Sequence, residues 1–381
     1  MISVKKRLGL IINPIAGIGG RVGLKGSDGI TIQKQAFALG ALPQARERSI
    51  QSLKQLVPIK EEFELITYPG EMGAEAARAC GFEPNVIGSI KPGKTTAQDT
   101  IDAAQELVQS GVDLILFAGG DGTARDIYNA IGDQVPVLGI PAGVKIHSAV
   151  FGTNPRTTGE LAGLFISGKA PRLREAEVMD IDEQAVRAGF VSAQLYGYLK
   201  IPYRRILVQS TKAGSSPGDG ETLHAIASDV LENMGDDCLY VIGPGTTTRA
   251  IVSEMGLTKT LLGVDVVCNG QMIAADSGES QILDLIKDRK VNIIITPIGG
   301  QGYLFGRGNQ QISPQVIKHL GSEEKQIKKN LIVVSAPGKI NSLNGRPFLV
   351  DSGDREVDKM LDGYVQVVTG YHERIMYRVS C

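Results

Sequence analysis

The carboxylate of Asp121 lies where this sequence is best equipped for chemistry. The apolar run Leu114–Phe117 leads into Ala118-Gly119-Gly120-Asp121-Gly122-Thr123, the pattern of a buried strand that ends in a glycine turn. Glycine lets backbone N–H groups approach a phosphate, and a nearby carboxylate can organise Mg²⁺ or take the proton of an acceptor hydroxyl. The pattern indicates phosphoryl transfer at Asp121, with four neighbours as candidates for phosphate contact: Gly119, Gly120, Gly122 and Thr123.

A helix is predicted directly after this turn, over Ala124–Ile131. Thr123 and Asp126 have the spacing of a capping box, and the N-terminus of a helix attracts anions. Asp126 is also a candidate for contact with the phosphoryl acceptor. A glycine turn that only joins a strand to a helix is the alternative interpretation, and the motif by itself leaves it open.

A second glycine turn follows the apolar run Leu8–Ile12 near the start of the chain. It begins at Asn13 and contains Gly17 and Gly19, and two turns at the ends of two strands can face one ligand. These three residues are therefore candidates for binding the phosphoryl donor. The G-x-G-x-x-G fingerprint of redox dinucleotide sites is not met, because Val22 occupies the third glycine position.

In these two turns the chain resembles the superfamily of NAD kinases and diacylglycerol kinases. Members carry an Asn-Pro-x-x-Gly turn early and a Gly-Gly-Asp-Gly-Thr turn later. Within the superfamily the sequence looks most like the ATP-NAD kinase group that includes the AcoX-type proteins. Three further segments carry that likeness: Thr95–Thr100, Gly139–Ser148 and Thr296–Gln310.

The resemblance implies a kinase that uses ATP, or another donor such as polyphosphate, with Mg²⁺ as cofactor. NAD or a related nucleotide is the implied acceptor, and Lys145 and His147 are candidates for contact with it. Lipid and sugar kinases share variants of the later turn, so a different small-molecule or lipid acceptor is an alternative. A non-catalytic nucleotide sensor is a further alternative.

Strand signals alternate with helical patterns in the first part of the chain, which predicts an α/β fold with a doubly wound parallel sheet. Ligands of such sheets bind outside the carboxyl ends of the strands, where both glycine turns fall. The predicted strands are Leu8–Ile12, Phe63–Tyr68, Asn85–Ile87, Asp113–Ala118 and Val135–Ile140.

Three parts of the chain are expected from this pattern and from the resemblance. Residues 1–168 form the kinase domain, and residues 169–362 form a second, acceptor-binding domain of mixed α/β structure rich in strands. Residues 363–381 form an antiparallel strand pair, and the resemblance implies its return to the first domain.

Two features of the second domain are candidates for acceptor contact. Asp180 and Asp182 share one face of a predicted strand, where paired carboxylates can orient a hydroxyl or Mg²⁺; a solvated strand edge is the alternative. Gly245, Thr246 and Thr247 follow an apolar run and open a predicted helix at Arg249–Met255. Plain capping of that helix by a threonine is the competing explanation.

A third glycine-rich turn follows the apolar run Val291–Ile295 and includes Gly300, Arg307 and Asn309. Arg307 is suited to bidentate bonds with a phosphate and Asn309 to reading a base or ribose. An elaborate turn packed against its own domain is the alternative. Lys339 follows another strand signal in a similar way, with a weaker pattern.

One segment fits the P-loop pattern G-x-x-x-x-G-K-[ST], namely Gly88–Thr95. Pro92 speaks against a P-loop because it lacks an N–H and restricts the preceding residue. Thr96 and Asp99 offer a simpler account as a capping box for a helix over Ile101–Val108. Thr96 is still a candidate for nucleotide contact.

Composition narrows the function classes. The chain has 381 residues, 40 basic and 41 acidic, with a formal net charge of −1, so it has no general attraction to nucleic acid or anionic membranes. Four scattered cysteines show no metal-ligand spacing, and the apolar run near the N-terminus is too short for a signal or membrane span. We expect a cytoplasmic protein that binds small nucleotides, and the resemblance implies a homo-oligomer.

Overall fold

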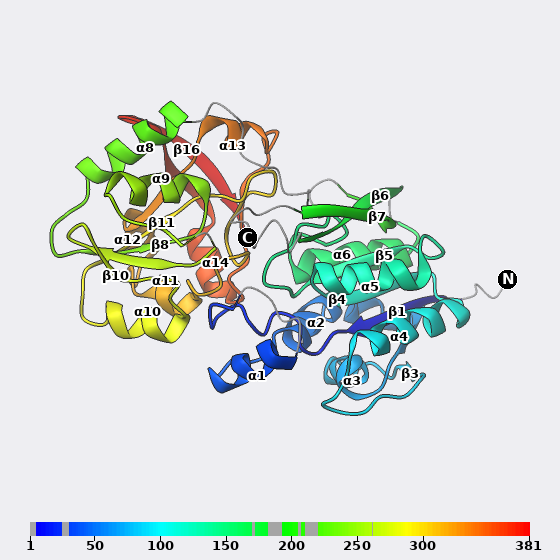
Figure 1. Ribbon diagram of the computed structural model, residues 1–381. Helices are drawn as coiled ribbons and strands as arrows, with labels where there is room; N and C mark the ends of the chain where they lie inside the picture. The colour runs from blue at the N-terminus through cyan, green and yellow to red at the C-terminus, as the bar shows by residue number, and fades with distance from the viewer. Residues whose placement is uncertain are drawn as a thin grey trace. The chain divides into compact units, whose positions relative to one another are not determined.

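The computed structural model describes residues 5–24, 30–169, 172–181, 193–204, 207–209, 220–260 and 262–381. The chain divides into two compact units, which are treated one at a time (Figure 1). Unit 1 consists of Met1–Ile18, Gly26–Gly29 and Leu42–Thr211. Unit 2 consists of Gly19–Lys25, Ile30–Ala41 and Lys212–Cys381.

Unit 1 is built on a parallel sheet of five strands in the order β3-β2-β1-β4-β5. Its central strands read as unbroken apolar runs because helices cover both faces of the sheet; every residue of β4 is buried. All five predicted strands are confirmed within two residues at their ends. They are β1 (Lys6–Ile12), β2 (Phe63–Thr67), β3 (Asn85–Val86), β4 (Leu114–Gly119) and β5 (Val137–Pro141).

The order of the strands indicates where unit 1 could bind a ligand. The chain moves from β1 outward to β3, then returns to β4 on the other side of β1. The connections that follow β1 and β4 therefore run in opposite directions along the sheet, and the carboxyl ends of these two strands are where a sheet of this kind binds its ligand. Helices α4 (Ala97–Gln109) and α5 (Asp121–Ile131) pack together on unit 1, as do α2 (Ala45–Leu53) and α6 (Pro155–Ile166).

A two-stranded hairpin extends unit 1 beyond its predicted limit at residue 168. Strands β6 (Leu173–Ile181) and β7 (Ala193–Pro202) pair in antiparallel fashion. They pack on α5 and β5 of unit 1, so the compact unit runs to Thr211. The smaller helices of this unit are η1 (Val57–Glu62), η2 (Gly70–Met72) and α3 (Ala74–Ala79).

Unit 2 contains a mixed sheet of nine strands in the order β10-β9-β8-β11-β13-β15-β16-β14-β12. Strands β8, β11, β13 and β15 are parallel and form its centre. The α/β fold with a strand-rich second part is thus confirmed. The strands are β8 (Leu239–Ile242), β9 (Asp265–Cys268), β10 (Gln271–Ala274), β11 (Val291–Ile295), β12 (Tyr303–Phe305), β13 (Leu331–Val334), β14 (Phe348–Val350), β15 (Gly363–Gly370) and β16 (Glu373–Ser380).

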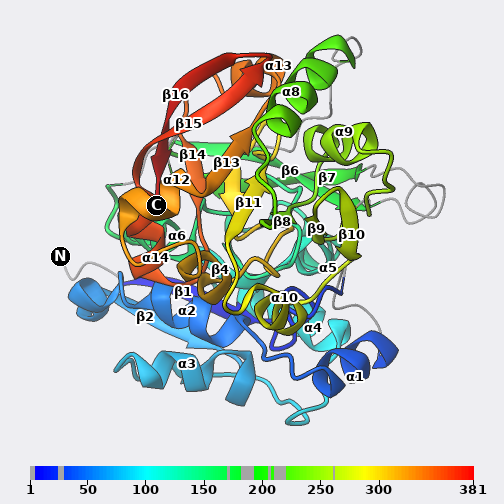
Figure 2. The same cartoon turned by 90° about the vertical axis from the view of Figure 1, so that its left-hand side faces the viewer.

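The central strands of unit 2 alternate between two apolar cores. Leu239 and Val241 of β8 face one core, whereas Tyr240 and Ile242 face the other. Helices α8 (Gly220–Glu232) and α9 (Thr246–Glu254) cover one face of the sheet (Figure 2). The other face is covered by α10 (Glu279–Ile286), α11 (Pro314–Lys318), α12 (Glu324–Lys329) and α14 (Arg355–Leu361). Two further helices of the unit are α1 (Ile30–Ala38) and α13 (Pro337–Asn341).

The last two strands form the predicted antiparallel pair but belong to the sheet of unit 2. Strand β15 pairs with β13, and β16 pairs with β14. The backbone groups of β15 and β16 are therefore bonded to strands of unit 2. The pair does not join the sheet of unit 1, to which the resemblance had implied a return.

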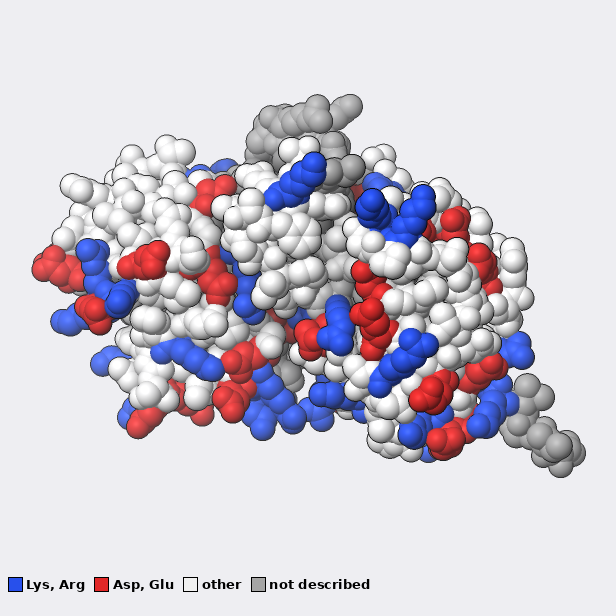
Figure 3. Space-filling model, turned by 90° about the horizontal axis from the view of Figure 1, so that it is seen from below, with Lys and Arg blue, Asp and Glu red and all other residues white. Residues whose placement is uncertain are grey.

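The surface carries charged side chains of both signs. Basic and acidic side chains are interspersed over the face in Figure 3, in line with the formal net charge of −1. Among the described residues, no helix is both long and apolar enough to cross a membrane.

Candidate functional site

Three loops of unit 1 pack backbone against backbone at the carboxyl ends of β1, β4 and β5. Gly17 has a φ of 79°, and a Cβ there would lie 2.1 Å from the carbonyl oxygen of Ala142. A Cβ on Gly143 would lie 2.7 Å from the Cα of Gly120. Only glycine permits such contacts, so the three loops form one cluster, hereafter the Asp121 cluster.

Asn13 joins the first of these loops to the second. Its backbone N–H donates to the carbonyl oxygen of Ala118 at 3.0 Å, and its side-chain Nδ2 donates to Thr123 Oγ1 at 3.0 Å. Residues 110 positions apart in the sequence are thereby fixed side by side. The predicted grouping of Asn13, Gly17 and Gly119 to Thr123 is present in unit 1.

Helix α5 begins three residues earlier than predicted. Its N-cap is Gly120 and its first residue is Asp121, so the expected capping box of Thr123 with Asp126 is wrong. The reason is that the Thr123 hydroxyl is inside the first turn and accepts from Asn13, while Asp126 lies 3.8 Å from Arg125 Nη2. Gly122 is the second residue of the helix.

The carboxylate of Asp121 is buried and fully hydrogen-bonded. Oδ1 accepts from the Ser148 N–H at 3.0 Å and from Ser148 Oγ at 2.6 Å. Oδ2 accepts from the His147 N–H at 2.7 Å and lies 3.1 Å from His147 Nδ1. Because an ionised carboxylate has about four acceptor positions, Asp121 has used all of its capacity within the chain.

The segment that carries His147 and Ser148 is anchored at several points. The N–H groups of Ala142 and Gly143 both donate to the carbonyl oxygen of Gly119 at 2.9 Å. Farther along, Ser148 Oγ accepts from the Met179 N–H at 2.9 Å, and the Ser148 carbonyl oxygen accepts from Gln209 Nε2 at 2.5 Å. The backbone around His147 is therefore held by β4, β6 and the segment after β7.

His147 is 3 % exposed, and its two ring nitrogens have different surroundings. Nδ1 faces the Asp121 carboxylate. Nε2 is buried, and no described residue offers it a hydrogen bond. A buried polar atom without a partner calls for an explanation.

The remaining candidates of unit 1 have other contacts. Asp180 forms an ion pair with Arg125 Nη1 at 2.5 Å, and Lys145 is half-buried in the same segment as His147. Asp182 lies outside the described residues. Thr96 is exposed, and its N–H donates to Asp99 Oδ2 at 2.7 Å. The predicted capping box at the start of α4 is thus confirmed. In the P-loop-like segment the Gly93 N–H donates to Glu71 Oε1 at 2.9 Å, so this donor is already in use.

A second polar cluster lies at the carboxyl ends of β8, β11 and β13 in unit 2. Lys339 Nζ donates to Thr247 Oγ1 at 3.2 Å and to Thr296 Oγ1 at 3.0 Å. We call these three residues the Lys339 cluster. Helix α9 starts here with Gly245 as N-cap, at a φ of 141° and without a side-chain cap. Threonine capping therefore does not explain the turn; Thr246 is simply the first helical residue.

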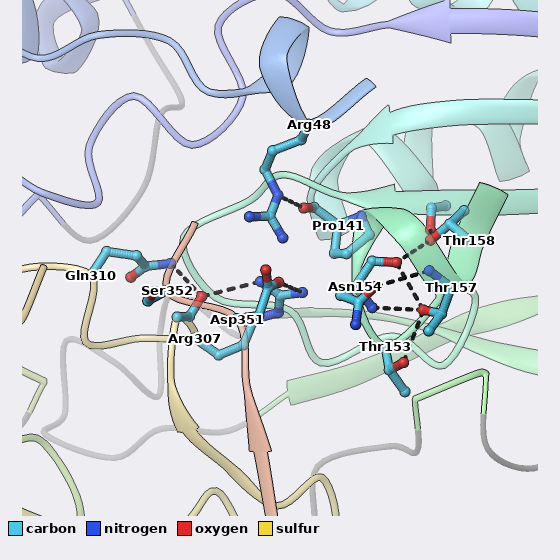
Figure 4. A network of polar contacts seen from close by, with 12 residues as sticks. Arg48, Pro141, Thr153, Asn154, Thr157, Thr158, Arg307, Gln310, Asp351 and Ser352 are labelled. Atoms are coloured by element: carbon cyan, nitrogen blue, oxygen red, sulfur yellow. Dashed lines mark hydrogen bonds and ion pairs between the residues drawn. The ribbon is translucent and has the colours of Figure 1, made fainter. Parts of the chain in front are cut away.

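The third glycine-rich turn is bonded to its own unit. Arg307 and Asp351 are both buried and form an ion pair at 2.9 Å (Figure 4). Asn309 accepts from the Gly306 N–H at 3.1 Å and donates to the Leu304 carbonyl oxygen at 2.7 Å. The carbonyl oxygen of Gly300 accepts from Arg346 Nη2 at 2.7 Å. These contacts favour the alternative of a turn packed against its own domain.

Two glycines predicted to bind the donor together fall in different units. Gly17 belongs to unit 1, whereas Gly19 belongs to unit 2 and accepts from the Leu24 N–H at 2.9 Å. The sequence had no signal for this division, because both glycines lie in one continuous turn.

Metal binding by side chains alone does not fit what is present. No group of three or more His, Cys, Asp or Glu side chains suited to a metal ion occurs in the described part of the chain. The acceptor positions of Asp121 are taken by His147 and Ser148. Asp121 is thus not arranged as a metal ligand in this structure.

Sequence reasoning gave little weight to several residues that the structure places in the two clusters. Ser148 follows β5 and Thr296 follows β11, both within segments already singled out, and Lys339 follows a Pro-Gly pair after β13. Gln209, which binds the carbonyl of Ser148, was missed. Its segment has no motif, so only the tertiary contact reveals it.

Comparison with known proteins gives the family. Residues 8–170 match the ATP-NAD kinase N-terminal domain, and residues 235–379 match the ATP-NAD kinase C-terminal domain. No curated protein matches the chain. Two solved structures described as "a putative diacylglycerol kinase from Bacillus anthracis str. Sterne" are each 19% identical, with TM-scores of 0.21 and 0.22.

These two alignments cover 47% and 48% of this chain, which spans only 46% and 45% of the solved chains. The family matches reach much farther, since the two together include most of the sequence. With both of its characteristic domains present, the chain belongs to the ATP-NAD kinase family.

Proposed function

We propose that this protein is a phosphotransferase that moves a phosphoryl group from ATP to a hydroxyl of NAD or a related nucleotide. The observation that carries the proposal is the Asp121 cluster. Three glycine-bearing loops meet at the carboxyl ends of β1, β4 and β5, around a buried carboxylate and the start of α5. We infer the identity of the phosphoryl donor from the family, because ATP-NAD kinases use ATP.

The Lys339 cluster supports a nucleotide as ligand. It combines an ammonium group, two threonine hydroxyls and the N-terminal end of the nine-residue helix α9. Helix N-termini and ammonium groups both attract phosphate oxygens. We assign this cluster to a phosphate of the acceptor nucleotide and keep Thr246 and Thr247 as acceptor-binding residues.

Mg²⁺ remains part of the proposal, as a companion of the nucleotide. Magnesium usually keeps several waters and binds substrate phosphates with few protein carboxylates. When bound in this way, it neutralises the charge of the transferring phosphoryl group. The chain's own residues then have to position the nucleotide and the acceptor hydroxyl and to handle the proton.

A non-catalytic nucleotide sensor is the second candidate. It is favoured by one observation, which is that the Asp121 carboxylate accepts all of its hydrogen bonds from its own chain. A sensor would bind ATP tightly without forming any product. A kinase with another small-molecule or lipid acceptor would consume ATP but leave NAD unchanged.

The test is incubation of purified protein with ATP, Mg²⁺ and NAD, with products separated by chromatography and identified by mass. Asp121→Asn is the variant, and Asp133→Asn is its matched control, because Asp133 has a 68% exposed side chain. Phosphorylated NAD from the wild type and the control, but not from Asp121→Asn, is the expected result. Tight ATP binding with no product from any acceptor would favour the sensor.

Three further expectations stay proposals. The partners are small nucleotides rather than nucleic acid or membranes, the protein acts in the cytoplasm, and it forms a homo-oligomer. Membership of the AcoX-type group is likewise an interpretation of the sequence motifs alone. Cell fractionation tests the location, and light scattering of the purified chain tests the oligomeric state.

A further inference from the structure

In the Asp121 cluster, the ring of His147 has one nitrogen to which no described residue forms a hydrogen bond. Asp121 accepts four contacts, and Ser148 Oγ both donates to Asp121 Oδ1 at 2.6 Å and accepts from the Met179 N–H at 2.9 Å. Of the polar side-chain atoms of Asp121, His147 and Ser148, only His147 Nε2 lacks a partner among the described residues. Among these three side chains, the hydrogen bonding is therefore complete except at this nitrogen.

The carboxylate decides which form of the imidazole is present. An ionised carboxylate can only accept hydrogen bonds, so the 3.1 Å contact with Oδ2 requires the proton to be on Nδ1. In the neutral ring, Nε2 is then an acceptor with a lone pair. The histidine is held in the form that can receive a proton at Nε2.

We propose that His147 Nε2 is the general base of the transfer reaction and that Asp121 is its positioning residue. This inference rests on the proposed function. The carboxylate fixes the ring and stabilises the imidazolium that forms when Nε2 is protonated, the division of labour found in other carboxylate–histidine pairs. A hydroxyl of the acceptor supplies the hydrogen bond that Nε2 lacks.

The chemical step balances without another reactant. The acceptor oxygen forms a bond to the γ-phosphorus of ATP, and the bond from that phosphorus to the bridging oxygen breaks. The electron pair leaves with ADP. The hydroxyl proton moves to His147 Nε2 and is released to water after the product departs.

Nearby ionisable groups must be considered in any pH experiment. Asp121 on α5 faces the ring directly. Arg48 on α2 binds the Pro141 carbonyl oxygen at the start of the segment, and Glu177 on β6 accepts from the Ala149 N–H at 2.9 Å through its backbone. Lys145 lies two residues before His147 in the same segment.

The experiment compares wild type, His147→Gln and a control with the same kind of ion pair at the surface. His224 Nδ1 lies 3.1 Å from Glu254 Oε2, but its side chain is 64% exposed, so His224→Gln is that control. Transfer is measured as kcat and KM across pH, with folding checked by circular dichroism. We expect His147→Gln to lose at least ~100-fold in kcat, with a smaller change in the KM for ATP.

The pH profile separates chemistry from structure. The wild-type and His224→Gln rates should fall toward acid, because protonated Nε2 cannot accept a proton, and the residual rate of His147→Gln should lack that fall. Added imidazole should restore part of the activity of His147→Ala. A folded His147→Gln protein that keeps its rate, or that keeps the acid fall, would overturn the inference.

Nitrogen NMR of the wild type gives a test that does not require turnover. The inference predicts that neutral His147 carries its proton on Nδ1, and a proton on Nε2 would refute it. A wild type that transfers phosphoryl to no acceptor would instead refute the proposed function. The two failures are thus distinguishable.

Discussion

Two buried aspartates, one in each unit, are satisfied in similar ways but have different partners. Asp121 is 6% exposed and Asp265 is 0% exposed. Asp265 accepts from Thr260 Oγ1 at 2.6 Å, from the Thr260 N–H at 2.9 Å and from the Asp276 N–H at 2.8 Å, and it pairs with Lys259 at 3.0 Å. Each carboxylate therefore receives two backbone N–H bonds, one hydroxyl and one ring or ammonium nitrogen.

The partners differ in what they leave unused. Lys259 Nζ donates to Gly263 and Thr260 carbonyl oxygens at 2.8 and 3.3 Å and also contacts Asp265, so all three of its N–H groups are bonded. His147 uses Nδ1 for Asp121 and leaves Nε2 without a described partner. Such an atom costs about 1–3 kcal/mol, which binding of a ligand would recover. A saturated pair stabilises a fold, whereas an unsaturated one is suited to a ligand.

The largest effect is expected for Asp265→Asn. The substitution removes the carboxylate that pairs directly with the buried Lys259 ammonium, and loss of one partner of a buried pair costs about 3–5 kcal/mol. Urea unfolding followed by circular dichroism measures the free energy of unfolding. Asp133→Asn serves as control, because its pair with Lys200 is exposed and its loss should change the free energy of unfolding little. An equally small loss for Asp265→Asn would remove the contrast.

Asp121→Asn should mainly affect the rate. The amide keeps the size of the side chain but brings an N–H₂ group against the N–H donors of His147 and Ser148 and disturbs the ring form. We expect at least ~100-fold lower transfer, equal to about 2.7 kcal/mol in the barrier, with the fold retained. An unchanged rate in the ATP and NAD assay would remove Asp121 from the mechanism.

Stability toward acid should depend on Asp265. Burial raises the pKa of this carboxyl, but the Lys259 ammonium and the bonds from Thr260 and Asp276 outweigh burial, so its pKa lies below the ordinary value. Its contribution is present above the unfolded pKa of about 3.9 and is lost as the pH falls through the lower folded value. Unfolding free energies from pH 6 downward should therefore decline less in Asp265→Asn than in wild type. Parallel declines would contradict this assignment.

Lys339→Met probes the cationic cluster of unit 2. Loss of an ammonium group that bonds a phosphate should weaken NAD binding about tenfold, or ~1.4 kcal/mol. Calorimetric titration with NAD measures the dissociation constant. The control is Lys200→Met, which removes an exposed lysine whose partner is Asp133. Equal affinity in both variants would place the nucleotide phosphate elsewhere.

The smallest effect is expected for a carboxylate whose bonds are local and exposed. Asp99 binds the N–H and hydroxyl of Thr96 at 2.7 and 2.9 Å, three residues away. Asp99→Ala should lower the free energy of unfolding by about 1 kcal/mol, as expected for a helix cap, without changing the rate. A loss as large as that of Asp265→Asn would show that burial is not what separates these carboxylates.

Local patterns predicted the positions of the elements well. The five strands of unit 1 and the capping box at Thr96 are present where the sequence places them, because apolar runs and capping residues act over a few positions. The capping box expected at Thr123 is absent, since the hydroxyl of Thr123 is engaged by Asn13, 110 residues away. Short-range rules fail where a distant residue offers a competing bond.

The sequence by itself determined the α/β fold, the two glycine turns and Asp121 as their central carboxylate. Only the tertiary structure decided what each polar group binds. Asp121 is satisfied by residues 26 and 27 positions later, and Arg307 pairs with Asp351 instead of standing ready for a phosphate. Hydrogen bonds in a buried site depend on which distant backbone and side-chain atoms the sheet brings within about 3 Å, and no local pattern records that.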